Sequence, residues 1–172
     1  MPQVDHLFYP ESRLKAFKFR LYPSRSQGRL LEQTLETCRQ WYNTCLEERK
    51  ATWAESREQV SLYDQLRKVK DLKATHPYAK NIHSHILQTV VQDLDKAFTA
   101  FFRRLKVGET PGYPRFKSRD RFDSFGLKED GNDFKRDGRR LRLTGIGRVR
   151  VRWHRALAGT VKTVRQAGQW YA

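Results

Sequence analysis

The stretch from Leu87 to Phe125 constrains the fold most, because a long amphipathic segment runs directly into a segment rich in Gly, Pro and basic residues. Two glycines and two prolines within residues 108–114 predict that a helix ends there and that a stiff, extended loop follows. Eight apolar residues before them recur at spacings of three and four, and they predict one wide apolar stripe on a buried helix: Leu87, Val90, Val91, Leu94, Phe98, Phe101, Phe102 and Leu105.

The loop after this helix carries basic and aromatic residues at short intervals: Arg115, Phe116, Lys117, Arg119 and Arg121. A stiff loop of this composition can contact a phosphate backbone and stack on a base. A solvated connection between two subdomains explains the same composition equally well. Composition alone therefore leaves both interpretations open.

The charge of the chain favours a polyanionic partner. Thirty-five Lys and Arg against 19 Asp and Glu give a net charge of +16. Residues 1–102 contribute 16 basic and 12 acidic groups, whereas residues 103–172 contribute 19 and 7. The late basic residues lie in strand-like and loop-like sequence rather than on an amphipathic helix, so nucleic acid is a better partner than a membrane surface.

Cysteine content and hydropathy predict a cytoplasmic protein. The two cysteines, Cys38 and Cys45, lie seven apart in a helical pattern and form neither a disulfide framework nor a zinc motif. The sequence shows no signal peptide and no apolar run of transmembrane length.

Periodicity in the first half predicts one strand followed by three helices, a small bundle inserted after one strand. Residues 14–22 alternate apolar and basic side chains, which is typical of a strand with one buried face. Ser24 or Ser26 can cap a helix that reaches about Trp53, and Ser61 with Asp64 predicts a capping box for a second helix. We expect the third helix to begin near residues 80–82.

Beyond the basic loop the hydrophobic period changes to two, which predicts strands at residues 121–127, 139–143, 147–153 and 160–166. Asp137-Gly138 is a hairpin-turn signal. In residues 147–153, Arg148, Arg150 and Arg152 fall on one face, a ladder of about 13 Å that is comparable with two phosphate steps. A last strand begins at residue 169 and is cut off at once, so we expect a truncated chain.

Histidines and late carboxylates give little support for a metal site or an enzyme. His83 and His85 are two apart, which predicts different faces of a helix, and we expect no metal site. The acidic residues of the last third fall in loop-like sequence, although a metal-dependent nuclease needs carboxylates on rigid elements. A divergent nuclease remains the enzyme alternative, and it would use the loop carboxylates Asp120, Asp123, Asp130 and Asp133.

Four segments in order resemble the N-terminal half of the TnpB proteins of insertion-sequence transposons, which are relatives of type V CRISPR effectors. They are LKAFKFRLYPS at residues 14–24, Trp41-Tyr42-Asn43 with Leu46 and Arg49, the third helix with Phe101-Phe102-Arg103, and GYPRFKS at residues 112–118. In that family the protein holds a guide RNA, reads a short motif beside the DNA target, and cuts with a RuvC-type domain.

The resemblance implies an α+β fold, with a small wedge-like β-barrel interrupted by an inserted three-helix bundle of helix-turn-helix type. It divides the chain into a flexible leader (1–12), the first barrel strand (13–24), the helical recognition bundle (25–106), and the basic loop with the remaining strands (107–172). The catalytic carboxylates of the family would lie beyond Ala172. We therefore expect no RuvC domain and no catalytic residue in this chain, and Mg²⁺ only with the nuclease domain.

The resemblance also implies contacts to both partners, guide RNA and double-stranded target DNA. Gln88 could pair with an adenine edge. The implied DNA contacts are Leu62, Tyr63, Ser84, His85, Gln88, Gly126 and Leu127. The implied RNA contacts are Lys18, Arg20, Arg103, Arg104, Arg115, Phe116, Lys117, Arg119, Arg148, Arg150 and Arg152. A transposase domain or regulator that binds duplex DNA without RNA remains the alternative.

Overall fold

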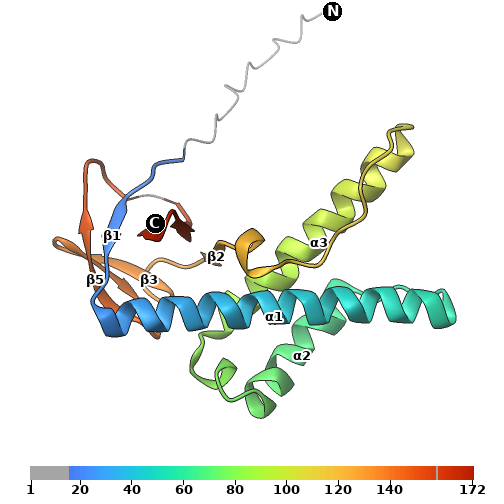
Figure 1. Ribbon diagram of the computed structural model, residues 1–172, viewed down its shortest axis with the longest axis horizontal. Helices are drawn as coiled ribbons and strands as arrows, with labels where there is room; N and C mark the ends of the chain where they lie inside the picture. The colour runs from blue at the N-terminus through green and yellow to red at the C-terminus, as the bar shows by residue number, and fades with distance from the viewer. Residues whose placement is uncertain (1–15, 158) are drawn as a thin grey trace, which may run out of the picture.

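A computed structural model describes residues 16–157 and 159–172, and it combines three α helices with one seven-stranded antiparallel sheet (Figure 1). The predicted leader and residues 13–15 lie outside the described part of the chain. The helices are α1 (Arg25–Ser56), α2 (Leu62–Thr75) and α3 (Ser84–Lys106). The strands are β1 (Arg20–Tyr22), β2 (Ser124–Leu127), β3 (Phe134–Asp137), β4 (Arg140–Leu143), β5 (Gly147–Arg152), β6 (Val161–Gln166) and β7 (Gln169–Tyr171). Short 3₁₀ turns, Ala79–Asn81 and Arg119–Arg121, precede α3 and β2.

Side-chain caps begin the first two helices as predicted. Ser24, rather than Ser26, caps α1, because its Oγ accepts from the Gln27 N–H at 3.2 Å while Gln27 Oε1 accepts from the Ser24 N–H at 3.0 Å. Ser61 and Asp64 make the same reciprocal pair on α2. The third helix begins at Ser84, later than predicted, because the chain first forms the 3₁₀ turn at residues 79–81.

The apolar stripe of α3 is buried over its first turns only. Leu87, Val90, Val91, Leu94 and Phe98 belong to the core. Phe102 and Leu105 are 45% and 46% exposed, so the prediction of a wholly buried helix is wrong at its C-terminal end. Figure 1 gives the reason, since the last turns of α3 extend away from α1 and α2.

The sheet is open and does not close into the small wedge-like β-barrel that was predicted. Its strand order is β2-β6-β7-β1-β5-β4-β3, so β2 and β3 are edges that do not pair with each other. The β2 edge meets a helix instead, because a Cβ built on Gly126 would lie 2.5 Å from Thr89 Cγ2 of α3. The first strand, β1, lies in the middle of the sheet between β5 and β7.

Alternation along the strands gives the sheet one buried face. Leu21, Leu141, Val149 and Val151 are at most 5% exposed. The prediction fails at Phe17, which is 44% exposed and lies under the Arg155 guanidinium. The predicted hairpin turn at Asp137-Gly138 is confirmed and joins β3 to β4. None of the described helices is long and apolar enough to cross a membrane.

Candidate nucleic-acid interface

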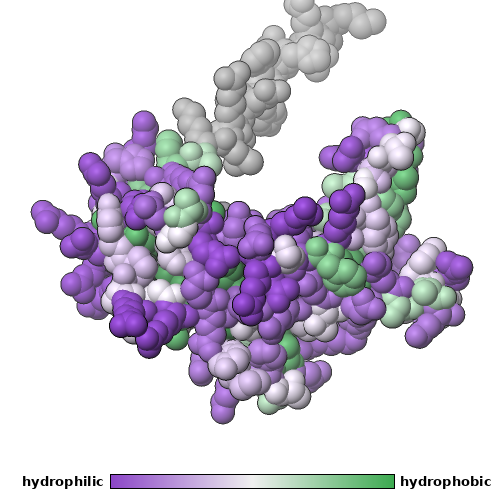
Figure 2. Space-filling model, viewed as in Figure 1, coloured by the Kyte–Doolittle hydropathy of each residue, from purple (hydrophilic) through white to green (hydrophobic). Residues whose placement is uncertain are grey.

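Six arginines lie on the solvent face of the sheet, opposite its buried side chains, and we call this surface the arginine face. On β4 and β5, arginines alternate with buried Leu and Val, so every guanidinium points outward. Figure 2 shows a mostly hydrophilic surface over the strands, at the left of the view. The arginine face consists of Arg20 on β1, Arg140 and Arg142 on β4, and Arg148, Arg150 and Arg152 on β5.

The register places these arginines directly opposite one another. Arg140 pairs with Arg150, Arg142 with Arg148, and Arg20 with Arg152. Residues opposite in an antiparallel ladder have Cβ atoms about 5 Å apart, and like charges in such pairs destabilise a sheet. One carboxylate reaches this surface among the described ion pairs, Asp137, whose Oδ2 lies 3.0 Å from Arg148 Nε. The face therefore concentrates positive charge at a cost to the fold.

Two tyrosines lie within this surface and orient the cations. The Arg150 and Arg20 guanidiniums lie 5.2 Å and 5.4 Å from the centre of the Tyr22 ring. Arg20 also donates to Tyr171 Oη at 3.3 Å, and the Lys18 ammonium lies 4.1 Å from the centre of that ring. Guanidiniums beside half-exposed aromatic rings can bind phosphate and stack on bases.

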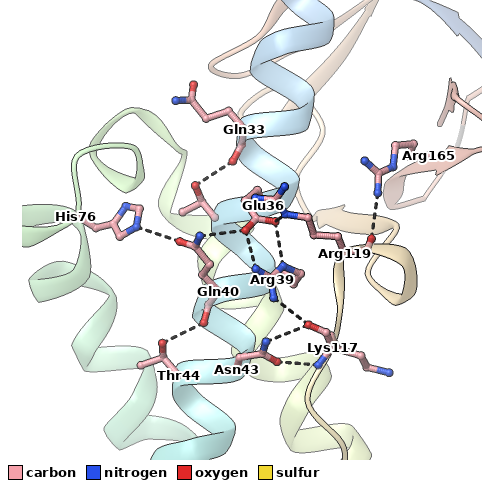
Figure 3. A network of polar contacts seen from close by, with 11 residues as sticks. Gln33, Glu36, Arg39, Gln40, Asn43, Thr44, His76, Lys117, Arg119 and Arg165 are labelled. Atoms are coloured by element: carbon pink, nitrogen blue, oxygen red, sulfur yellow. Dashed lines mark hydrogen bonds and ion pairs between the residues drawn. The ribbon is translucent and has the colours of Figure 1, made fainter.

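The basic loop is held against α1 through the backbone of Lys117 (Figure 3). Asn43 accepts the Lys117 N–H at 2.8 Å and donates to the Lys117 carbonyl at 3.0 Å, and Arg39 donates to the same carbonyl at 3.0 Å. Neighbouring Phe116 is 45% exposed, and its ring centre lies 4.7 Å from the Lys50 ammonium. The loop thus presents an aromatic side chain to solvent from a fixed backbone.

Arg119 is partly neutralised by its surroundings. Its Nε lies 3.4 Å from Glu36 Oε2, and its carbonyl accepts from Arg165 Nη2 at 3.1 Å. Hydrogen bonding to Arg39 holds the pKa of Glu36 below its usual range, against the opposing effect of burial. Arg119 therefore belongs to an ion-pair network between α1 and the sheet (Figure 3), and its side chain is 77% exposed.

The predicted RNA contacts fall into three groups rather than one. Lys18, Arg20, Arg148, Arg150 and Arg152 lie on or beside the sheet. Arg115, Phe116, Lys117 and Arg119 follow the loop along α1. Arg103 and Arg104 lie in the last turn of α3, where Arg104 pairs with Glu109 at 2.5 Å, and Figure 1 places that turn at the opposite end of the molecule from β5.

The predicted DNA contacts are also divided. Ser84, His85 and Gln88 lie at the start of α3, and Gly126 of β2 packs on that part of the helix. Leu127 is 2% exposed, so its side chain cannot reach a base.

Leu62 and Tyr63 begin α2 and lie at the other end of α3. Ser61, the residue before them, lines an open pocket of about 680 Å³ together with Phe98. Phe98 is about 21 Å from Ser84 along the helix axis, at about 1.5 Å per residue. Tyr63 is 70% exposed, so it remains available to a partner there.

Sequence reasoning missed Arg140 and Arg142 as site residues. The signal was present, since RRLRL alternates in the same way as the following strand. What the pattern did not reveal was that β4 pairs with β5 in the register that unites their arginines.

Sequence reasoning also misplaced His83. This residue precedes α3 as its N-cap rather than lying on the helix, and its ring points toward the same carboxylate as that of His85. His83 Nδ1 and His85 Nδ1 lie 3.1 Å and 2.9 Å from Asp133 Oδ1. Among the described residues, these three form the group of potential metal ligands within 4.8 Å of one another. Of the four carboxylates of the nuclease alternative, Asp133 alone belongs to this group, and Asp120, Asp123 and Asp130 are exposed.

Comparison with known proteins gives similarity to transposon-associated proteins. The helix-turn-helix domain of the IS605 OrfB family matches residues 13–58. The chain is 30% identical over 169 residues to "Putative RNA-guided DNA endonuclease InsQ" of Escherichia coli K12, and 28% identical over 165 residues to "Putative RNA-guided DNA endonuclease" of Streptomyces pristinaespiralis. These alignments cover 92% and 91% of the chain but 39% and 40% of the relatives, so the chain spans about two fifths of the length of the curated relatives it matches.

The matched segment contains β1 and one continuous helix, α1. A turn at residues 57–61 follows, where Arg57 adopts a left-handed backbone conformation, and α2 begins after the matched segment. A helix-turn-helix geometry in this protein therefore requires α1 and α2 together.

Proposed function

We propose that this chain, which belongs to the TnpB family, is a nucleic-acid-binding module that holds a guide RNA on the arginine face and contacts duplex DNA with its helices. In this proposal the sheet and the basic loop form the wedge-like RNA-holding unit, and residues 25–106 form the recognition unit. The residues assigned here bind, and none of them is assigned to cleavage.

The observation that carries the proposal is the pairing of arginines across β1, β5 and β4. Three like-charge pairs face one another with Asp137 as the neutralising carboxylate, an arrangement that a polyanion can stabilise. Contacts from these arginines to the phosphate backbone would position a nucleic acid without reading its sequence. This fits partners whose sequence is read by base pairing, as the names of the two relatives indicate for those proteins.

The DNA assignment rests on the start of α3. Ser84 and Gln88 are half-exposed on the first turns of that helix, one turn apart and therefore on one side. Gln side chains can bond bidentately to an adenine edge in the major groove. Tyr63 at the start of α2 would contact a separate part of the same duplex.

The test measures affinity for a structured RNA by fluorescence anisotropy between about 50 mM and 300 mM salt. We expect that the triple variant with Arg148, Arg150 and Arg152 replaced by Ala binds more weakly. Its salt slope should also fall by up to about 2, at about 0.7 per lost phosphate contact.

The matched control removes the same charge from the helices. Arg67 and Lys96 are 81% and 78% exposed, and Lys70 is also exposed. Replacing these three by Ala should leave the slope near that of the unmodified chain. Equal losses in both triple variants would contradict a site on the arginine face.

A second candidate function is a regulator or transposase domain that binds duplex DNA without RNA, which the helix-turn-helix match favours. The two are distinguished by the nucleic acid that co-purifies with the chain. A guide-RNA binder should carry material that ribonuclease removes and deoxyribonuclease does not. The reverse sensitivity would favour the duplex-only function.

A further inference from the structure

We infer that His83, His85 and Asp133 form a binding site for a transition-metal ion of the Zn²⁺ class, which joins the start of α3 to the turn between β2 and β3. The site uses residues outside the arginine face and does not depend on the proposed function. Two imidazole nitrogens and one carboxylate oxygen converge there from segments about 50 residues apart in the chain.

Asp133 is prepared to act as a ligand. Its side chain is fully buried, and its Oδ2 accepts the N–H groups of Lys128 at 2.8 Å and Glu129 at 3.1 Å. These hydrogen bonds fix the carboxylate, with Oδ1 directed at the two imidazoles.

His83 supplies the observation that hydrogen bonding does not explain. Its Nδ1 lies 3.1 Å from Asp133 Oδ1, close enough for an ion pair, but this buried atom makes no hydrogen bond to any of the described residues. An unsatisfied buried polar atom is costly. A metal ion between the three ligand atoms would satisfy both Nδ1 lone pairs and the remaining carboxylate oxygen.

The spacing and donor set fit a tetrahedral ion. Zn–N and Zn–O bonds of about 2.0–2.2 Å place neighbouring ligands of a tetrahedron about 3.4 Å apart. The two observed N···O distances, 2.9 Å and 3.1 Å, are slightly shorter than that value, and all three ligand atoms lie within 4.8 Å of one another, so rotations of the imidazoles would bring them to the distances that the ion needs. Glu129 can complete the set, since its Oε2 lies 4.0 Å from His85 Nδ1.

Two imidazoles favour Zn²⁺ or a similar transition metal over Mg²⁺, which prefers oxygen ligands. The ion would be coordinated by Nδ1 of His85. His85 is also a predicted DNA contact, and its Nε2 would remain available to other partners. The metal would therefore orient the segment that carries Ser84 and Gln88 rather than take part in chemistry.

The experiment titrates the chain, without a histidine affinity tag, with Co²⁺ and with Zn²⁺. We expect one Co²⁺ per chain with a visible ligand-field absorption band that Zn²⁺ bleaches. With Zn²⁺ at about 100 times its dissociation constant, the Tm should rise by roughly 5–10 °C, and a chelator should reverse this rise.

Two ligand variants and one matched control complete the design. His83→Ala and His85→Gln should each abolish the band and the Tm rise. His154→Gln removes an exposed histidine outside the cluster and should retain both. A Tm without metal close to that of the unmodified chain shows that each variant folds, and His83, which is 32% exposed, is the substitution that least disturbs packing.

Two results would overturn the inference. The first is substoichiometric Co²⁺ with no Tm rise in the unmodified chain. The second is equal loss of the band in His154→Gln and in the ligand variants, since that would trace the signal to dispersed surface histidines.

Discussion

Arg140 and Arg150 lie opposite each other on β4 and β5, and both side chains are exposed. Their repulsion acts in the folded state and is relieved in the unfolded chain, so each such pair reduces stability. The arginine face thus favours binding of a polyanion but lowers the stability of the fold, a trade-off that is common at functional surfaces.

We expect Arg140→Thr to raise the free energy of unfolding by about 0.2–1 kcal/mol while weakening RNA binding. The change removes one like charge and introduces a residue that favours strands. Urea denaturation at low salt measures the gain. Near 1 M salt the Debye length is about 3 Å, so the gain should largely disappear, and a gain that persists there would have a cause other than charge.

For single residues, the sequence predicted which basic side chains point outward, because the alternation of apolar and basic residues along a strand is a local pattern. It could not predict the cluster of His83 and Asp133. These residues lie about 50 positions apart, and their contact depends on how α3 docks on the β2–β3 turn.

Two side chains of α1 hold the loop between α3 and β2, and Asn43 makes two of their three hydrogen bonds to the Lys117 backbone. The Asn43 amide makes both an acceptor and a donor bond to the Lys117 backbone, much as a neighbouring strand would. The prolines stiffen the loop, and the Asn43 bonds, together with the Arg39 bond to the same carbonyl, hold it against α1.

We expect Asn43→Ala to release the loop. The two lost hydrogen bonds should reduce stability by about 1–3 kcal/mol, and cleavage by trypsin after Arg115 and Lys117 should become faster. Limited proteolysis followed by mass spectrometry of the fragments measures the effect.

The control is Gln33→Ala, on the same helix, because Gln33 enters the network through its backbone carbonyl rather than its amide. Unchanged cleavage in Asn43→Ala would mean that packing of Phe116 and Tyr113 over Lys50 holds the loop instead.

Elements with local signals were the predictable part of the fold. Ser24, Ser61 and Asp137-Gly138 marked two helix starts and a hairpin turn, all of which the structure contains. The open sheet was not predictable in this way, because closure depends on whether β2 meets β3 or a helix. The exposed C-terminal end of α3 was not predictable either, because an apolar stripe in the sequence does not show how far other elements pack against it.

In the whole molecule, the C-terminal strands β5 and β7 lie on either side of the N-terminal strand β1. Phe19 and Ala172 exchange backbone hydrogen bonds at 2.8 Å and 3.0 Å, and Trp170 of β7 is 6% exposed, with its ring centre 6.5 Å from that of Phe125. The C-terminal strand therefore belongs to the core of the sheet.

We expect Trp170→Ala to reduce stability by about 3–5 kcal/mol, because it leaves a cavity between β2 and β7. Trp53→Ala is the matched control, since Trp53 is 46% exposed and should cost much less. Thermal unfolding followed by circular dichroism compares the two variants. A loss of stability in Trp170→Ala no larger than the small loss expected for Trp53→Ala would show that β7 adds little to the stability of the sheet.

The central position of β1 has a consequence for biosynthesis. Leu21 leaves the ribosome 130 residues before its neighbour Val151, an interval of about 6–26 s at 5–20 residues per second. The helices can form early, because their contacts are closer in sequence, whereas β1 must wait with both of its edges unsatisfied. A nascent chain released during that interval would expose a strand ready to associate with other chains.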